Sequence, residues 1–448
     1  MLVPEAERSL RRVVLGLDPN ETKLFMVPET VAWDPKTKDP RVRWLRRQLY
    51  RLAFELSHGQ IFRNFPPQTR FFIAAPDPST TPESLGNEEA VFREHLRERV
   101  AWSDRVIDER VRFFSVPAPV PFPQDMAEPI GYDEKGRLIL GMGEDADDAY
   151  RRAVERLVAA YPDEFVVRPL PGINTEGGDL ALVRLPEGGV GLLVGHNRVA
   201  RYVQGRHSEI PLGTPIPEDQ IEEARRAYQR AFDGIETIIV GVEALRNPRL
   251  ANPEIFHLDM LVAVLRTPSS IVAFVPTYEG SPVDAISHVH LPAEAVTRFQ
   301  AEYDRTARQL AARGYRVARV PFADHPARNP VGIGKFVDPA TGRPWVILGR
   351  YPDHLADSDD RNAQTQLQLV FEALDTAVAV WRHDPTEARW SAVRAAVASA
   401  WQQMDASVAA PNPVFESQRK VYESYGVAVL SLPIYPTGEG GIHCLVLK

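Results

Sequence analysis

The sequence is poor in cysteine and in long apolar segments, and both shortages narrow the classes of protein it can represent. Its 448 residues include a single cysteine, which cannot form an internal disulfide or a cysteine-rich zinc site. The apolar runs, such as TIIVGV and MLVAVL, are too short to span a bilayer. The first residues mix acids with arginines and lack the apolar segment of a signal peptide. We therefore expect a cytoplasmic protein that does not enter a membrane.

An excess of basic charge is also missing. There are 52 Lys and Arg residues against 60 Asp and Glu, and the formal net charge is -8. The basic residues are scattered among the acids, so the sequence predicts no nucleic-acid partner. An acidic surface favours a cationic ligand instead. Proline and glycine are plentiful, at 39 and 28 residues, and predict many short, sharply turned loops.

One order of elements recurs along the chain: two strands, an amphipathic helix and a short apolar strand. Apolar spacing predicts helices at 88–100, 147–160, 217–232, 292–313 and 413–425. The strands that close each copy are expected at 111–116, 165–167, 237–242, 316–320 and 427–432. Strand pairs are expected at 181–185 with 190–194, 261–265 with 271–275, and 335–337 with 345–348.

The pattern predicts an α/β fold of five rough copies in a single domain over residues 1–448. Residues 1–65 supply a lead-in strand at 13–17 and a helix at 41–57, and residues 353–412 form a helical insertion in the fifth copy. If each copy directs its closing strand toward a shared axis, the loops after those strands converge, and ligands gather at such places.

These five loops hold the chemically versatile side chains. They carry, in chain order, Asp125 in the dipeptide QD, Glu176 and Asp179 in EGGD, His257 and Asp259 in HLD, Arg328 in ARNP, and Cys444 in GGIHC. The four motifs QD, EGGD, HLD and GGIHC, in this order, resemble those of the guanidino-group-modifying (pentein) superfamily, which includes arginine, agmatine and peptidylarginine deiminases and glycine amidinotransferases. The resemblance extends over roughly residues 110–448 as ordered motifs. It implies a five-bladed α/β propeller with pseudo-fivefold symmetry, and the repeated pattern agrees with it.

The resemblance also implies an activity, namely a hydrolase that deiminates an arginine-like guanidino compound and releases ammonia and a ureido product such as citrulline. The substrate would be a small molecule or a peptidyl arginine, with no metal and no other cofactor. A guanidinium is a planar cation that paired carboxylates bind through charge-assisted hydrogen bonds. Asp125 and Asp259 match the two aspartates that bind this group, and Arg328 lies where we expect substrate selection. Asp179 is grouped with the substrate-binding residues without an assigned contact.

Three residues match the family's catalytic positions. Cys444 would attack the guanidinium carbon and form a covalent amidino intermediate. His257 would protonate the departing nitrogen and then activate water. Glu176 would orient the imidazole or a substrate nitrogen.

Other interpretations stay open. An amidinotransferase shares the first half-reaction, and a non-catalytic binding relative needs none of it. By itself, Cys444 would suit a small buried residue, and His257 a core histidine. His288 and His290 have a metal-ligand spacing but no evident third ligand, so we expect no metal. The sequence does not choose the substrate, nor does it distinguish a monomer from a homo-oligomer.

Overall fold

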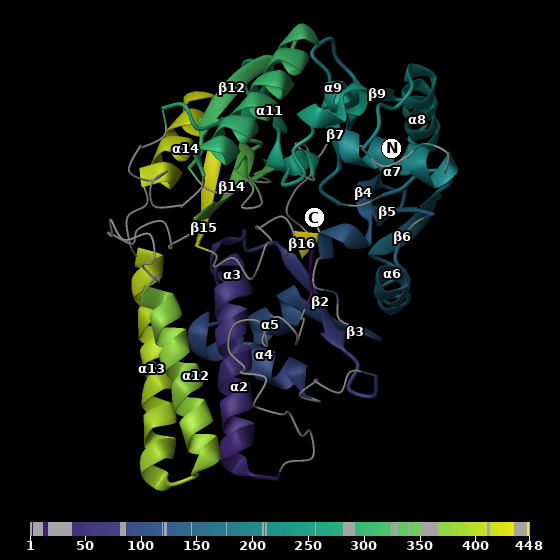
Figure 1. Cartoon of the computed structure of the whole chain (residues 1–448). Coiled ribbons are helices and arrows are strands. Elements are labelled where there is room, and N and C mark those ends of the chain that lie inside the picture. The colour runs from purple at the N-terminus through teal and green to yellow at the C-terminus, as the bar shows by residue number, and fades with distance from the viewer. Residues whose placement is uncertain are drawn as a thin grey trace.

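The protein is a mixed α/β structure with five small sheets (Figure 1). It is known from a computed structural model that describes residues 2, 12–16, 38–80, 87–118, 120, 123–144, 146–175, 177–207, 210, 213–255, 257–280, 292–323, 326, 330–338, 341–350, 366–409, 413–433 and 446–447.

Four of the sheets share one topology, in which the first two strands are antiparallel and the third is parallel to the second. A parallel pair needs a long crossover, and helices supply it. In chain order the sheets contain β4 (Glu128–Tyr132), β5 (Leu138–Gly143) and β6 (Phe165–Leu170); β7 (Leu180–Arg184), β8 (Val190–Gly195) and β9 (Glu236–Val240); β10 (Ala263–Arg266), β11 (Ile271–Thr277) and β12 (Arg316–Pro321); and β13 (Ile333–Val337), β14 (Pro344–Arg350) and β15 (Ala428–Pro433). The crossover helices are α6 (Asp148–Ala160), α7 (His196–Arg206), α8 (Glu218–Ala231), α11 (Ala293–Ala312) and α14 (Pro413–Ser424).

The remaining sheet joins strands from both ends of the sequence. Its order is β16 (Val446–Leu447), β1 (Arg12–Gly16), β2 (Arg70–Pro76) and β3 (Val111–Val116). Strand β16 is antiparallel to β1, with Val14 opposite Leu447. Helices α4 (Glu88–Arg99) and α5 (Asp104–Arg110) form the crossover from β2 to β3. This sheet therefore has three parallel strands, one more than each of the others, and its antiparallel strand comes from the far end of the chain.

Each sheet shares a hydrophobic core with two neighbouring sheets. Five core clusters contain residues of two sheets each, represented by Phe72 with Phe165, Leu170 with Leu182, Leu193 with Ala273, Phe274 with Val346, and Ile347 with Ile73. Aromatic contacts contribute to two of these shared cores. The ring centroids of Phe72 and Phe165 lie 4.7 Å apart, and those of Phe274 and Tyr422 lie 4.4 Å apart. The sheets thus follow one another in cyclic order.

A second part of the molecule is helical and extends away from the sheets (Figure 1). Helix α2 (Pro40–Phe54) packs there against the antiparallel pair α12 (Gln366–His383) and α13 (Glu387–Ala409). Its seam is aromatic, because Trp390 lies 5.4 Å from Trp44 and 4.9 Å from Trp381, measured between ring centroids. A short π-helix, η2 (Glu55–Gly59), links α2 to α3 (Gln60–Asn64). Helices α12 and α13 lie within the segment 353–412, which was predicted to be helical.

The five predicted crossover helices and the three predicted strand pairs are all present, with ends shifted by a few residues. The strand expected at 237–242 is shorter than predicted, ending at Val240. Gly241 takes a left-handed conformation with φ 80° and starts the short helix α9 (Val242–Arg246). Helices α5 and α7 and strands β2, β4, β5 and β16 were not predicted as separate elements.

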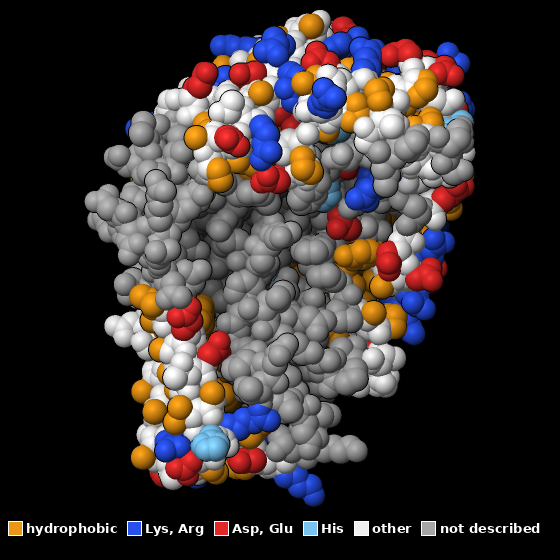
Figure 2. Space-filling model, in the orientation of Figure 1, with side chains coloured by type: hydrophobic (Ala, Val, Ile, Leu, Met, Phe, Trp, Pro, Cys, Tyr) orange, Lys and Arg blue, Asp and Glu red, His pale blue; other side chains and the backbone are white. Residues whose placement is uncertain are grey.

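The described surface mixes both signs of charge. Figure 2 shows acidic and basic side chains interspersed on the face in view, without a broad region of one sign. Within the described ranges, no helix combines the length and apolar character needed to cross a bilayer.

Candidate functional site

Three loops from between successive sheets meet at one place. They are the 3₁₀ turn η3 (Pro123–Met126) after β3, the segment 177–179 before β7, and the 3₁₀ turn η5 (Leu258–Met260) before β10. The Gln124 side-chain amide donates a hydrogen bond of 3.0 Å to a carboxylate oxygen of Asp259. The Asp259 backbone N–H donates one of 2.9 Å to the carbonyl of Gly178. These two bonds tie all three loops together.

Two glycines permit this close approach. A Cβ atom on Gly178 would lie 2.8 Å from Nδ1 of His257 and 3.1 Å from a carboxylate oxygen of Asp259. Gly178 also has φ 91°, a conformation that side-chain-bearing residues rarely adopt. A Cβ atom on Gly177 would collide with the backbone carbonyl of Gln124. The paired glycines of EGGD therefore let the loop lie against the Gln124 backbone and the His257 and Asp259 side chains.

Asp179 is enclosed by protein groups. One of its carboxylate oxygens accepts the Leu258 backbone N–H at 3.0 Å, and the other accepts the Arg198 guanidinium Nε–H at 3.2 Å. Both side chains of this ion pair are at most 2% exposed. Asp179 therefore fastens the turn that carries His257 and Asp259 to helix α7, on which Arg198 lies.

The carboxylates lie in a desolvated, mutually repelling setting. The pKa of Asp125 is raised from 3.8 to about 6, chiefly by burial; the negative charge of Asp259 contributes to this rise, while His257, Arg198 and Arg201 act against it. Asp125 is partly exposed, whereas Asp259 is buried. The place thus combines an accessible carboxyl group with a buried one and favours a cation that neutralises both.

Asp179 experiences opposing influences. Burial and the negative charge of Asp259 raise the pKa of its carboxyl group, while His257, the Leu258 backbone N–H and Arg201 act against this rise. Because two N–H donors, one of them cationic, already point at the carboxylate, we expect Asp179 to be ionised near neutral pH.

Four of the seven predicted site residues lie together, namely Asp125, Asp179, His257 and Asp259. Glu176, Arg328 and Cys444 lie outside the described residues, so their placement stays a prediction. The described strand nearest to Cys444 in sequence is β16, which begins two residues after it, at Val446, and contacts η3.

Sequence reasoning missed three residues of this site. Gln124 had a signal, because it is the first residue of the QD dipeptide, but no role was assigned to it. Arg198 and Arg201 lie on α7, a helix that was not predicted, and no motif pointed to them. Among the described residues, no group of three or more His, Cys, Asp or Glu side chains is arranged to hold a metal ion.

The sequence matches no protein-family model, and no curated protein is significantly similar to it. The site therefore has to be interpreted from its own chemistry. It brings together the carboxyl groups of Asp125 and Asp259, the imidazole of His257 and, through Asp179, the guanidinium of Arg198.

Proposed function

We propose that the protein is a guanidine-modifying hydrolase of the pentein type that deiminates an arginine-like compound. The observation that carries this proposal is the convergence of Asp125, Asp259 and His257 from two separate loops. Two carboxylates beside an imidazole suit a guanidinium, because its N–H groups lie in one plane and can donate to both acids. Desolvation strengthens this attraction, since a buried carboxylate has few other partners for its charge.

The proposed propeller architecture has support from the arrangement of the sheets. Five sheets with related topology and shared cores in cyclic order are what five blades around one axis require. The contacts of β10 with both β7 and β13 favour the first strand of each sheet as the one nearest the axis. Loops that precede these strands would then face the axis. Segments 177–179 and 257–259 are such loops, because they precede β7 and β10 in the sequence.

The proposed reaction has two half-reactions that involve the same carbon atom. The thiolate of Cys444 forms a bond to the guanidinium carbon, and the C–N bond to one terminal nitrogen breaks as His257 supplies the proton that lets it leave as ammonia. Water, deprotonated by His257, then adds to the amidino-thioether carbon. The C–S bond breaks, the thiolate is restored, and the ureido product departs. Asp125 and Asp259 bind the remaining nitrogens throughout.

Asp179 acts as a positioning residue in this proposal. Its contacts are with Leu258 and Arg198, so its effect on substrate is exerted through the turn that holds His257 and Asp259. Arg328 remains a proposed determinant of substrate selection and Glu176 the proposed partner of His257 or of a substrate nitrogen.

The test measures ammonia and ureido product from arginine, agmatine, N-acetylarginine, a blocked arginyl peptide and guanidinoacetate. We expect one of these to be turned over, with a loss of roughly a thousandfold or more in kcat for Cys444→Ser. Asp259→Asn should abolish turnover while circular dichroism shows an intact fold. Cysteine-dependent transfer of the amidino group to an added amine, without ammonia, would identify an amidinotransferase instead. Failure of both assays across the panel would contradict the proposal.

A further inference from the structure

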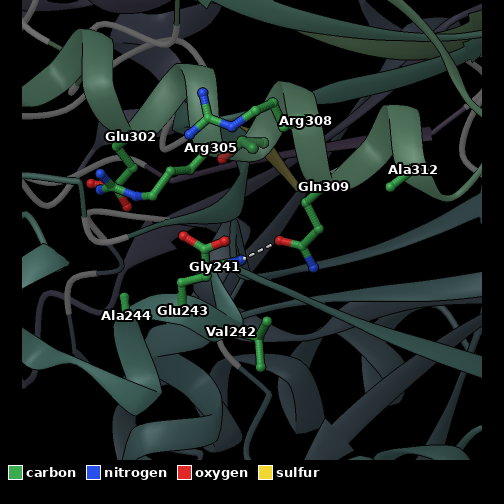
Figure 3. A pocket seen from close by; sticks show the side chains of 10 residues that line it. Gly241, Val242, Glu243, Ala244, Glu302, Arg305, Arg308, Gln309 and Ala312 are labelled. Carbon is green, nitrogen blue, oxygen red and sulfur yellow. Dashed lines mark hydrogen bonds between the residues drawn. The ribbon is translucent and has the colours of Figure 1, made fainter.

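A cavity lies between helix α11 and the segment that follows β9 (Figure 3). Its volume is about 340 Å³, within the range of small-molecule sites. The lining comes from residues 241–244 and from one face of α11 between residues 302 and 312. None of these residues belongs to the set around Asp125 and Asp259.

One wall of the cavity is fixed by Gln309. Its side-chain carbonyl accepts the Gly241 N–H at 3.0 Å, and its side-chain amide donates to the Ile239 carbonyl at 2.6 Å. Gly241 is pressed against His196, since a Cβ atom there would lie 2.6 Å from the imidazole Nδ1. These hydrogen bonds hold the end of β9 to α11, so the two sides of the cavity are fixed relative to each other.

Four charged side chains line the cavity: Glu243, Glu302, Arg305 and Arg308 (Figure 3). Among the described residues, none of the four forms an ion pair. This is unusual for this protein, in which nearby arginines such as Arg246 and Arg298 pair with Glu218 and Glu254. Two acids and two bases around one cavity, without pairing among themselves, match a ligand that carries both charges.

Glu302 gives the strongest sign of a missing partner. Its side chain is buried, at 3% exposure, yet one carboxylate oxygen accepts no hydrogen bond from the described residues. Burial raises the pKa of Glu302 to about 7, although Arg305 and the Asn252 backbone N–H act against this rise. Leaving a buried acceptor unsatisfied is costly, and a ligand ammonium group would satisfy it.

The arginines complete the recognition. Arg305 donates to the Leu250 carbonyl at 2.8 Å, which holds its guanidinium at the cavity, and Arg308 is exposed one helical turn further along α11. A guanidinium binds a carboxylate through paired N–H groups. We propose that this cavity binds a small zwitterion of the α-amino-acid type, with its ammonium at Glu302 and its carboxylate at Arg305 and Arg308.

The test uses isothermal titration calorimetry on the full chain with L-alanine, L-norvaline and L-glutamine, none of which carries a guanidino group. We expect at least one to bind with a dissociation constant below about 1 mM. The N-acetyl and amide derivatives of the best binder, which lack the ammonium and the carboxylate respectively, should each bind at least about tenfold more weakly.

Variants then locate the binding. Glu302→Gln and Arg308→Gln should each weaken it by roughly tenfold or more, whereas Glu294→Gln, an exposed change near the start of α11, should leave it unchanged. Asp259→Asn should also leave it unchanged, which separates this cavity from the proposed active site. Absence of binding by all three amino acids at 10 mM, about ten times the expected limit, would overturn the proposal. So would equal binding of the N-acetyl derivative, or binding that Asp259→Asn abolishes and Glu302→Gln does not.

Discussion

Asp125 illustrates how a single side chain can favour ligand binding at the expense of stability. Its native pKa of about 6 exceeds the ordinary value of 3.8 because burial disfavours the charged form. The native protein therefore binds this proton more tightly than the unfolded chain does. The resulting stabilisation is complete below pH 3.8 and is lost as the pH rises through about 6.

We predict that Asp125→Asn makes the protein more stable above pH 7 and leaves its stability near pH 4 unchanged. A rise from 3.8 to about 6 corresponds to at most about 3 kcal/mol in the free energy of unfolding. Urea denaturation of both proteins between pH 4 and pH 8 measures this difference. Asp163→Asn, in an exposed turn, is the control and should not change the pH dependence. Parallel profiles for wild type and Asp125→Asn would show that the carboxyl is not desolvated.

The same substitution should weaken substrate binding where the proposed function holds. In the wild type the ionised form of Asp125 binds a guanidinium, so KM should rise as the pH falls below about 6.

The sequence predicted only in part which of the acids are desolvated. QD, EGGD and HLD identified Asp125, Asp179 and Asp259 as a group. The burial of Asp179 beside Arg198 could not be predicted, because Arg198 lies on helix α7, which no sequence motif indicated.

At the scale of elements, turn η5 is held by side chains as well as by its own backbone. The Asp179 carboxylate accepts the Leu258 N–H and also pairs with the buried Arg198. We predict that Asp179→Asn lowers the free energy of unfolding by about 2–4 kcal/mol, because it removes the negative charge that faces Arg198. It should also lower kcat more than it raises KM, since it loosens the turn that holds His257. Chemical denaturation and steady-state kinetics measure the two effects.

Asp233→Asn is the matched control, because its ion pair with Arg168 is on the surface, with side chains 57% and 33% exposed. Such pairs contribute about 1 kcal/mol or less. Equal losses in the two variants would mean that Asp179 does not fasten the turn.

The elements that the sequence predicted are those with a strong local signal. The crossover helices carry apolar residues at helical spacing, and the three hairpins have turn residues between apolar strands. Strands β4 and β5 lack such a signal, because Pro129, Gly131, Gly141 and Gly143 interrupt them and their pairing contains a register shift. Helix α7 starts directly after β8 at Gly195, without a capping side chain, so nothing in the sequence marks its beginning.

At the scale of the whole molecule, the recurring order of elements was predictable, but the pairing between the two ends of the chain was not. Periodicity reports on neighbours in sequence, whereas the pairing of β1 with β16 joins residues at opposite ends of the chain. The two-residue strand β16 is too short to show a pattern of its own. Strand β1 also packs tightly against the segment after β3, because Gly16 lacks the side chain that would collide with the Val120 carbonyl.

Because β16 covers the open edge of β1 and contacts η3, we predict that removing residues 446–448 affects both stability and the candidate site. An uncovered edge exposes unpaired backbone groups, so the shortened protein should melt about 2–5 °C lower and aggregate more readily. Cys444 is retained in this variant, yet activity should fall at least about tenfold, because the chain that follows it is no longer anchored beside Asp125. Removing Lys448 alone keeps both paired residues and should change neither property. Scanning calorimetry measures the melting temperature, light scattering measures aggregation, and the ammonia assay measures activity. Full activity after removal of 446–448 would mean that the pairing of β16 with β1 does not contribute to the arrangement of the site.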